Sequence, residues 1–67
     1  MSKIECWAAV EKNGDEFFYN GKPVWNEKDQ EWYLGDKDDK FLQVPKGVIR
    51  RLTGIFLQYT DDPIKIQ

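Results

Sequence analysis

The chain has 67 residues with 10 basic and 12 acidic side chains, which gives a net charge of −2, and it contains no histidine and a single cysteine. This length supports one domain, and the mild charge lacks the concentrated positive field that strong, non-specific binding to nucleic acid or anionic membranes requires. The lone cysteine, Cys6, excludes an internal disulfide and a cysteine-cluster metal site, as is typical of an intracellular protein.

The first residues and the hydropathy of the sequence indicate where in the cell the protein is expected. Lys3 and Glu5 lie within the first five residues and no long apolar run follows them, which predicts that the chain has no secretory leader. No stretch approaches the ~18 consecutive apolar residues that a membrane span needs. We therefore expect a cytoplasmic protein that does not bind membranes.

A β-hairpin is the clearest pattern near the N-terminus. Between residues 3 and 11, apolar side chains recur at every second position: Ile4, Cys6, Ala8 and Val10. Such alternation is typical of a strand with one face on the core. Asn13-Gly14 follows and is typical of a type I′ turn, in which both central residues have positive φ. The sequence therefore predicts a hairpin from this strand into a second one at residues 16–20.

Turn residues and polar stretches divide the middle of the chain into short strands. Asn20-Gly21 marks a second turn. Pro23 lacks an N–H group, so the next strand starts beside it or lies at a sheet edge. The predicted strands are 24–26, 31–34 and 41–44, separated by polar turns at 26–31 and 35–40.

The pattern changes after residue 44, where a short helix is predicted at residues 46–53. Pro45 suits the first turn of a helix, and Gly54 suits a left-handed cap at its end. The apolar residues of this segment fall on one helical face: Val48, Ile49 and Leu52.

Alternation returns at residues 55–60, which predicts a further strand, and a turn at 61–63 separates it from a terminal edge strand with Ile64 and Ile66. Together these elements predict one compact α+β domain over residues 1–67. Its core would be a small antiparallel β-meander or partly open barrel of about five to six short strands, with one short helix near residues 46–53. The element order leaves open an SH3-like barrel, an OB-like barrel or a curled sheet with the helix across its open end.

Ten aromatic residues in so short a chain need an explanation, and the first is that they fill a small core. Strand alternation also divides them into two sets. The set expected to face the core contains Phe17, Tyr19 and Trp32, and the set on the opposite face contains Trp7, Phe18 and Tyr33. This second face is either covered, which gives a two-sided core, or exposed as an aromatic binding surface.

Catalytic and metal sites are not indicated. General acid–base chemistry relies most often on histidine, which the chain lacks. Cys6 lies on the apolar face of the first strand, where we expect a buried small hydrophobe. The acidic stretch 36–39 lacks the ligand spacing of a calcium loop and is interrupted by Lys37. We therefore expect a non-enzymatic protein without catalytic residues, metal or cofactor.

Three cations give the predicted helix a small basic patch: Lys46, Arg50 and Arg51. Arg50 and Arg51 lie near its C-terminal end, where the helix dipole favours positive charge, so a purely structural role is sufficient. The functional alternative is contact with an acidic partner or with a phosphate backbone.

The resulting hypothesis is a small protein-interaction module. It would be a phage-type or accessory modulator or inhibitor of a larger protein, or a self-associating domain such as a homodimer. Trp7, Phe18 and Tyr33 would be its hydrophobic anchors, with Arg50 and Arg51 as rim charges. The alternative is a small barrel that binds single-stranded nucleic acid, in which the same aromatic side chains stack on bases and the helix cations contact phosphates.

One local pattern resembles a known family. Trp7, the block Glu16-Phe17-Phe18-Tyr19-Asn20 and Trp25 follow one another in an order similar to the tryptophan, aromatic block and tryptophan of WW domains. The resemblance implies a three-stranded sheet that binds proline-rich peptides. It is confined to residues 7–25, Trp25 follows the block too closely, and the histidine and threonine of the family's second loop are missing.

Overall fold

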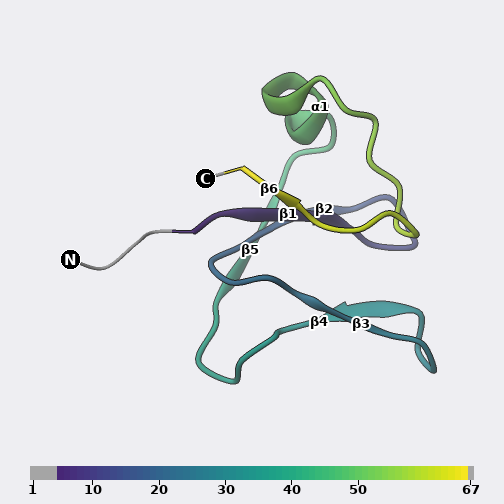
Figure 1. Cartoon of the computed structure of the whole chain (residues 1–67). Helices are drawn as coiled ribbons and strands as arrows, with labels where there is room; N and C mark the ends of the chain where they lie inside the picture. Colours follow the sequence, from purple (N-terminus) through teal and green to yellow (C-terminus); the bar gives the residue numbers. More distant parts are fainter. Residues whose placement is uncertain (1–4, 67) are drawn as a thin grey trace.

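The computed structural model describes residues 5–66, which form six short antiparallel strands and one helix (Figure 1). The predicted α+β class and the short helix near residues 46–53 are therefore confirmed. The strands do not close into a barrel, because they form two separate sheets. In chain order the elements are β1 (Trp7–Val10), β2 (Glu16–Tyr19), β3 (Val24–Asn26), β4 (Glu31–Tyr33), β5 (Phe41–Val44), α1 (Val48–Thr53) and β6 (Ile64–Lys65).

Most predicted strands are present, some with shifted ends. β3 and β5 have the predicted bounds, whereas β2 and β4 each end one residue earlier than predicted. The first predicted strand began at residue 3. Residues 3 and 4 lie outside the described part of the chain, and β1 runs from Trp7 to Val10.

The molecule has three layers. Its middle layer is a four-stranded sheet in the order β5-β2-β1-β6, so β5 lies beside β2 although the β3–β4 hairpin comes between them in the chain. That hairpin forms a separate sheet below the middle one, and α1 with the segment that follows it lies above (Figure 1). The two central strands of the middle sheet, β1 and β2, are therefore covered on both faces.

The turn between β1 and β2 decides which side chains share a face. Gly14 donates its N–H to the carbonyl oxygen of Glu11 at 2.8 Å, and Glu11 donates its N–H to the carbonyl oxygen of Asp15 at 2.8 Å. Gly14 has a φ of 91°, whereas Asn13 does not have a positive φ. This geometry is a three-residue loop with a glycine bulge, so the predicted type I′ turn is wrong. The difference shifts the register by one residue and turns β2 over relative to β1.

The shifted register gives the middle sheet a hydrophobic cluster on each face. The helix-side cluster contains buried Ala8, Val10 and Ile49, with Phe18, Leu57 and Ile66 packed against them. The hairpin-side cluster contains buried Ala9, Tyr19 and Trp32, with Trp7, Phe17, Trp25 and Leu34 packed against them. Ala8 and Ala9 point to opposite faces and both are enclosed, since their small side chains let the helix and the hairpin approach the sheet closely.

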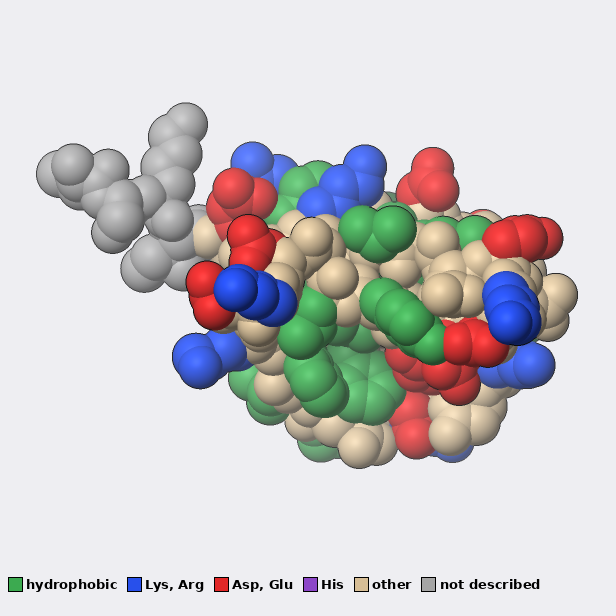
Figure 2. Space-filling model, turned by 90° about the horizontal axis from the view of Figure 1, so that it is seen from below, with side chains coloured by type: hydrophobic (Ala, Val, Ile, Leu, Met, Phe, Trp, Pro, Cys, Tyr) green, Lys and Arg blue, Asp and Glu red, His purple; other side chains and the backbone are tan. Residues whose placement is uncertain are grey.

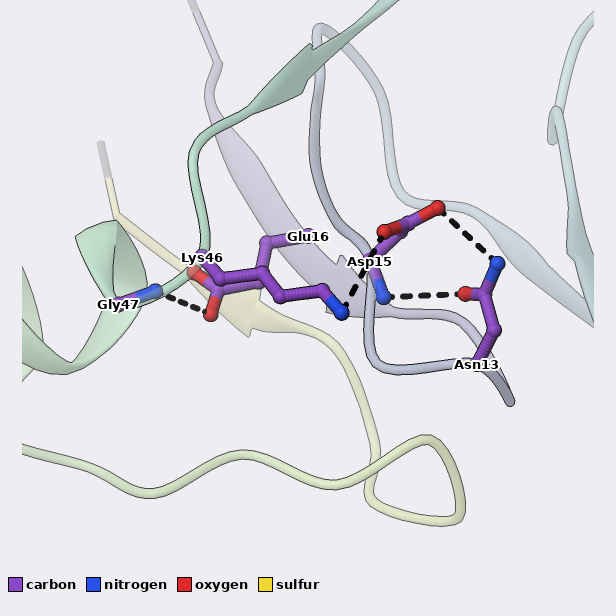
Figure 3. Close-up of polar contacts among 5 residues, drawn as sticks. All are labelled: Asn13, Asp15, Glu16, Lys46 and Gly47. Atoms are coloured by element: carbon purple, nitrogen blue, oxygen red, sulfur yellow. Dashed lines mark hydrogen bonds and ion pairs between the residues drawn. The ribbon is translucent and has the colours of Figure 1, made fainter.

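The helix α1 depends on a contact from β2. Isolated helices shorter than about 12 residues are marginal in water, and α1 is only six residues long. Its N-cap residue, Gly47, provides no side-chain hydrogen bond. The carboxylate of Glu16 takes that role, because it accepts the N–H of Gly47 at 2.7 Å and the N–H of Ile49 at 2.9 Å (Figure 3 shows the first of these). At the other end, Gly54 has the predicted left-handed conformation, with a φ of 75°.

The strand predicted at residues 55–60 is wrong. The chain turns near the end of this irregular segment, where Asp61 donates its N–H to the carbonyl of Gln58 at 3.0 Å and accepts the Gln58 N–H on its carboxylate at 2.9 Å. The free edge of β1 is taken by β6, which confirms the predicted terminal edge strand. The carbonyl oxygen of Tyr59 instead accepts the indole N–H of Trp32 at 3.1 Å, which ties the segment to the hairpin.

Candidate functional site

The three aromatic residues expected to act as anchors do not share a face. Trp7 lies opposite Tyr19 and joins the hairpin-side cluster, whereas Phe18 lies opposite Ala8 and packs on the helix-side cluster. Tyr33 belongs to the other sheet. The expectation of a common aromatic face is therefore wrong, because the glycine bulge shifts β2 by one residue relative to β1.

Trp7 and Phe18 are both half-buried and have structural contacts. The indole N–H of Trp7 donates to Glu5 Oε1 at 2.8 Å. Lys22 Nζ and Lys65 Nζ lie 5.6 and 5.9 Å from the centroid of its ring, which is within the range of cation–π attraction. Phe18 covers part of the helix-side cluster. The surroundings of these two rings are those of core side chains on the two central strands of the sheet.

Tyr33 lies on the outer face of the β3–β4 hairpin. Val24 is directly opposite it, and the neighbouring pair, Trp25 and Trp32, packs inward. Tyr33 is 44% exposed and donates its hydroxyl hydrogen to the carboxylate of Asp29. That hydrogen bond is the main reason that the pKa of Tyr33 is raised, since it favours the protonated phenol.

Arg50 and Arg51 are exposed, and Arg50 lines a pocket of about 380 Å³ that we call the helix pocket. The Arg50 guanidinium carbon lies 5.5 Å from the centroid of the Phe56 ring. The pocket walls come from the β1–β2 hairpin, the start of α1 and the segment after it: Val10, Gly14, Glu16, Lys46, Gly47, Ile49, Arg50, Ile55, Phe56 and Leu57. The pocket therefore combines apolar walls with two cations.

Sequence reasoning missed Ile55 and Phe56 as surface residues of this pocket. Both were assigned to a strand, where one would have faced the core. In the structure Phe56 is 69% exposed, and Ile55 is also exposed. The available signal was an apolar run directly after the helix stop at Gly54, without a polar turn between them.

The acidic groups near the helix pocket are already engaged (Figure 3). Both carboxylate oxygens of Glu16 accept backbone N–H groups of α1. Asp15 accepts the side-chain N–H of Asn13 at 3.0 Å and lies 3.9 Å from Lys46 Nζ, and this is the only ion pair within residues 5–66. Arg50 itself forms no ion pair with an acidic side chain within residues 5–66.

A second exposed apolar surface lies on β5, where Phe41 and Leu42 are both more than half exposed. The Phe41 ring centroid lies 5.8 Å from that of Phe17 and 6.0 Å from that of Tyr19. Figure 2 views the molecule from the side of the β3–β4 hairpin and shows hydrophobic side chains gathered in one area of that face, with acidic side chains beside it. The surface that contains Phe41 and Leu42 is separate from the helix pocket, since the two share no lining residue.

Burial of Tyr19 leads to a prediction for high pH. Burial, followed by the nearby Glu11 carboxylate, raises the pKa of Tyr19 to about 12. An unfolded tyrosine ionises near pH 10, so between about pH 10 and 12 the unfolded state loses a proton that the folded state keeps. We expect the free energy of unfolding to fall as pH rises through this window, and Tyr19→Phe to make that fall shallower. Urea unfolding at several pH values measures both slopes, and equal slopes in the two proteins would contradict the prediction.

The Cys6 thiol and the potential metal-ligating side chains are the remaining candidates for a functional site. Burial raises the pKa of the Cys6 thiol, which reduces the fraction of reactive thiolate at neutral pH. Within residues 5–66, no group of three or more potential metal-ligating side chains is close enough to hold an ion. The helix in this same part of the chain is not long and apolar enough to cross a membrane.

Comparison of the chain with protein-family models, with curated protein sequences and with solved structures finds no match.

Proposed function

We propose that this chain is a non-enzymatic protein-interaction module that binds an acidic segment of a larger protein at the helix pocket. One observation carries the proposal: exposed apolar side chains are concentrated beside cations. Ile55 and Phe56 are two of the seven large hydrophobic residues exposed in the described chain, and both line the helix pocket together with Arg50. A contiguous apolar surface with a charged rim is typical of a binding site.

Charge supports an acidic partner. The chain carries a net charge of −2, and of the two cations that line the pocket, Lys46 lies beside Asp15, whereas Arg50 has no ion-pair partner within residues 5–66. Arg50 is therefore available to pair with an acidic side chain of a partner. Phe56 presents an apolar ring with a guanidinium above it, and aromatic and arginine side chains often contribute most of the binding energy at interfaces.

Single-stranded nucleic acid has less support as the ligand. Its recognition needs aromatic side chains that are exposed together, and the expected stacking residues Trp7 and Phe18 lie on opposite faces of the middle sheet. The cations of the helix pocket lie beside aliphatic groups and one exposed ring, that of Phe56.

A displayed library of random peptides tests the proposed function. Selection against the intact chain should enrich peptides that combine acidic with large apolar residues. For a synthetic peptide from that selection, fluorescence anisotropy should show that Phe56→Ser and Arg50→Glu each raise the dissociation constant by about tenfold or more. Circular dichroism of the two variants verifies that they keep the fold.

Phe41→Ser is the matched control, because Phe41 is also an exposed phenylalanine but lies on β5. We expect it to leave the affinity for the selected peptide unchanged. The proposal is wrong if no acidic, apolar peptides are enriched, or if Phe41→Ser weakens their binding as much as Phe56→Ser does.

A further inference from the structure

The outer edge of β5 is a free sheet edge with an apolar strand. β5 ends the order β5-β2-β1-β6, and within residues 5–66 no strand pairs with its outer side. The opposite edge, β6, is two residues long and contains Lys65, which are features that discourage pairing with another chain. β5 is twice as long and carries no charged residue. It is the strand best suited to accept another strand at its edge.

The backbone groups that β5 presents to the outside follow from its ladder with β2. Asn20 donates its N–H to the carbonyl oxygen of Lys40 at 3.1 Å, which makes these two residues a hydrogen-bonded pair. Such pairs alternate in an antiparallel ladder, so Leu42 directs its backbone groups toward β2. Phe41 and Gln43 therefore direct their N–H and C=O groups outward.

We infer that β5 pairs antiparallel with β5 of a second copy of this chain, around a two-fold axis at Leu42. In this register Phe41 of one copy and Gln43 of the other exchange two hydrogen bonds, and the same happens on the other side of the axis. All four outward groups of Phe41 and Gln43 are then satisfied in each copy. The two Leu42 residues form the central pair, which is not hydrogen-bonded and brings their side chains close together.

The neighbours of Leu42 favour this arrangement. An apolar row crosses the helix side of the sheet through Ile64, Ala8, Phe18 and Leu42, which are cross-strand neighbours in turn. The row ends at Leu42, which is 60% exposed. A second copy continues it with the same residues in reverse order, so the exposed leucine gains an apolar neighbour.

The segments that flank β5 determine how long the contact between the two copies is and which charges face each other across it. Pro45 has no N–H to donate, so the ladder ends after Gln43. Residues 36–40, Asp-Lys-Asp-Asp-Lys, precede β5 with a net charge of −1, and Lys46 follows it. In the proposed register Asp38 of one copy lies opposite Lys46 of the other, which places opposite charges together. A contact of this length is small, so the dimer forms reversibly with concentration.

This inference does not rest on the proposed function, because the residues paired in the dimer, Phe41, Leu42 and Gln43, do not line the helix pocket. Sedimentation velocity of the full chain over roughly a hundredfold range of concentration should show a monomer–dimer equilibrium. Leu42→Lys places two ammonium groups together at the axis and should raise the dimer dissociation constant by about tenfold or more. Leu52→Lys is the matched control, since Leu52 is also 60% exposed but lies on α1, and it should leave the dimer unchanged. A chain that stays monomeric, or two variants that act alike, would overturn the inference.

A disulfide tests the register directly in a background with Cys6→Ser, which removes the only native thiol. With oxidised glutathione as the oxidant, Leu42→Cys should give a covalent dimer, because residues paired across the axis without hydrogen bonds have Cα atoms about 4.5 Å apart, within the range for disulfides. Gln43→Cys should not, since Gln43 faces Phe41 and not itself. Cross-linking that is stronger for Gln43→Cys than for Leu42→Cys would refute this register.

Discussion

Replacement of Trp32 by alanine should lower the free energy of unfolding by about 3–5 kcal/mol, the usual cost of truncating a buried tryptophan. Trp32 is the only buried residue of the β3–β4 hairpin in the hydrophobic clusters of residues 5–66. Its ring centroid lies 5.0 Å from that of Trp25, and its indole N–H donates to the carbonyl of Tyr59. The change removes the packing that holds the hairpin on the sheet and leaves a carbonyl without its partner.

Such a loss is comparable to the whole stability expected for a domain of this size, roughly 3–10 kcal/mol. Urea denaturation followed by far-ultraviolet circular dichroism measures the change without relying on tryptophan fluorescence. Trp25→Ala is the control, because Trp25 is only half-buried and donates its indole N–H to the exposed Glu27. We expect a smaller loss for Trp25→Ala, and an equal or larger one would show that Trp32 is not the anchor of the hairpin.

Ile49→Ala should lower the free energy of unfolding by about 2–5 kcal/mol. Ile49 is the only buried residue of α1, with 1% of its surface exposed, and it packs with Ala8 and Val10 on the helix side of the sheet. Alanine at this position leaves a cavity and removes the apolar contact that docks a helix too short to form alone.

Leu52→Ala is the matched control for Ile49→Ala. The sequence placed the two residues on one helical face, yet Leu52 is 60% exposed. We expect Leu52→Ala to change the free energy of unfolding by less than about 0.5 kcal/mol, as surface substitutions usually do. Thermal and urea unfolding of both variants provide the comparison, and similar losses would mean that α1 packs through both side chains.

Local patterns were sufficient to predict most elements of the fold. Alternating or apolar runs bounded by turn residues predicted β2, β3, β4 and β5, because short strands between polar turns leave a clear signal. Gly54 predicted the end of α1 because only a few residue types adopt its left-handed conformation readily. These features depend on residues near one another in the sequence.

The predictions were wrong or incomplete where the structure depends on one turn residue or on contacts between residues far apart in the sequence. Asn13-Gly14 suits a type I′ turn, but the three-residue loop closes on Gly14 alone, and that single residue determines whether Trp7 shares a face with Phe18 or with Tyr19. The cap of α1 comes from Glu16, which is 31 residues from Gly47 in the sequence. No pattern near Gly47 in the sequence predicts that Glu16 caps the helix.

The candidate site was predicted only in part. Arg50 lines the helix pocket, whereas the aromatic anchors proposed from strand alternation are divided between the two clusters and the outer face of the hairpin. Phe56 was missed because residues 55–60 alternate like a strand. Residues 55–60 form no strand, because β6 pairs with the edge of β1 and the chain turns at Gln58.

The register between β1 and β2 is the basis of the two-sided core, and nuclear magnetic resonance tests it most directly. Glu11 and Asp15 form a hydrogen-bonded pair, so the close Hα–Hα contacts of the antiparallel ladder fall two residues apart, between Val10 and Glu16 and between Ala8 and Phe18. Strong Hα–Hα nuclear Overhauser effects are expected for these two pairs. A strong effect between Ala9 and Phe18 in their place would mean a two-residue turn at Asn13-Gly14, and would return Phe18 to the same face as Trp7.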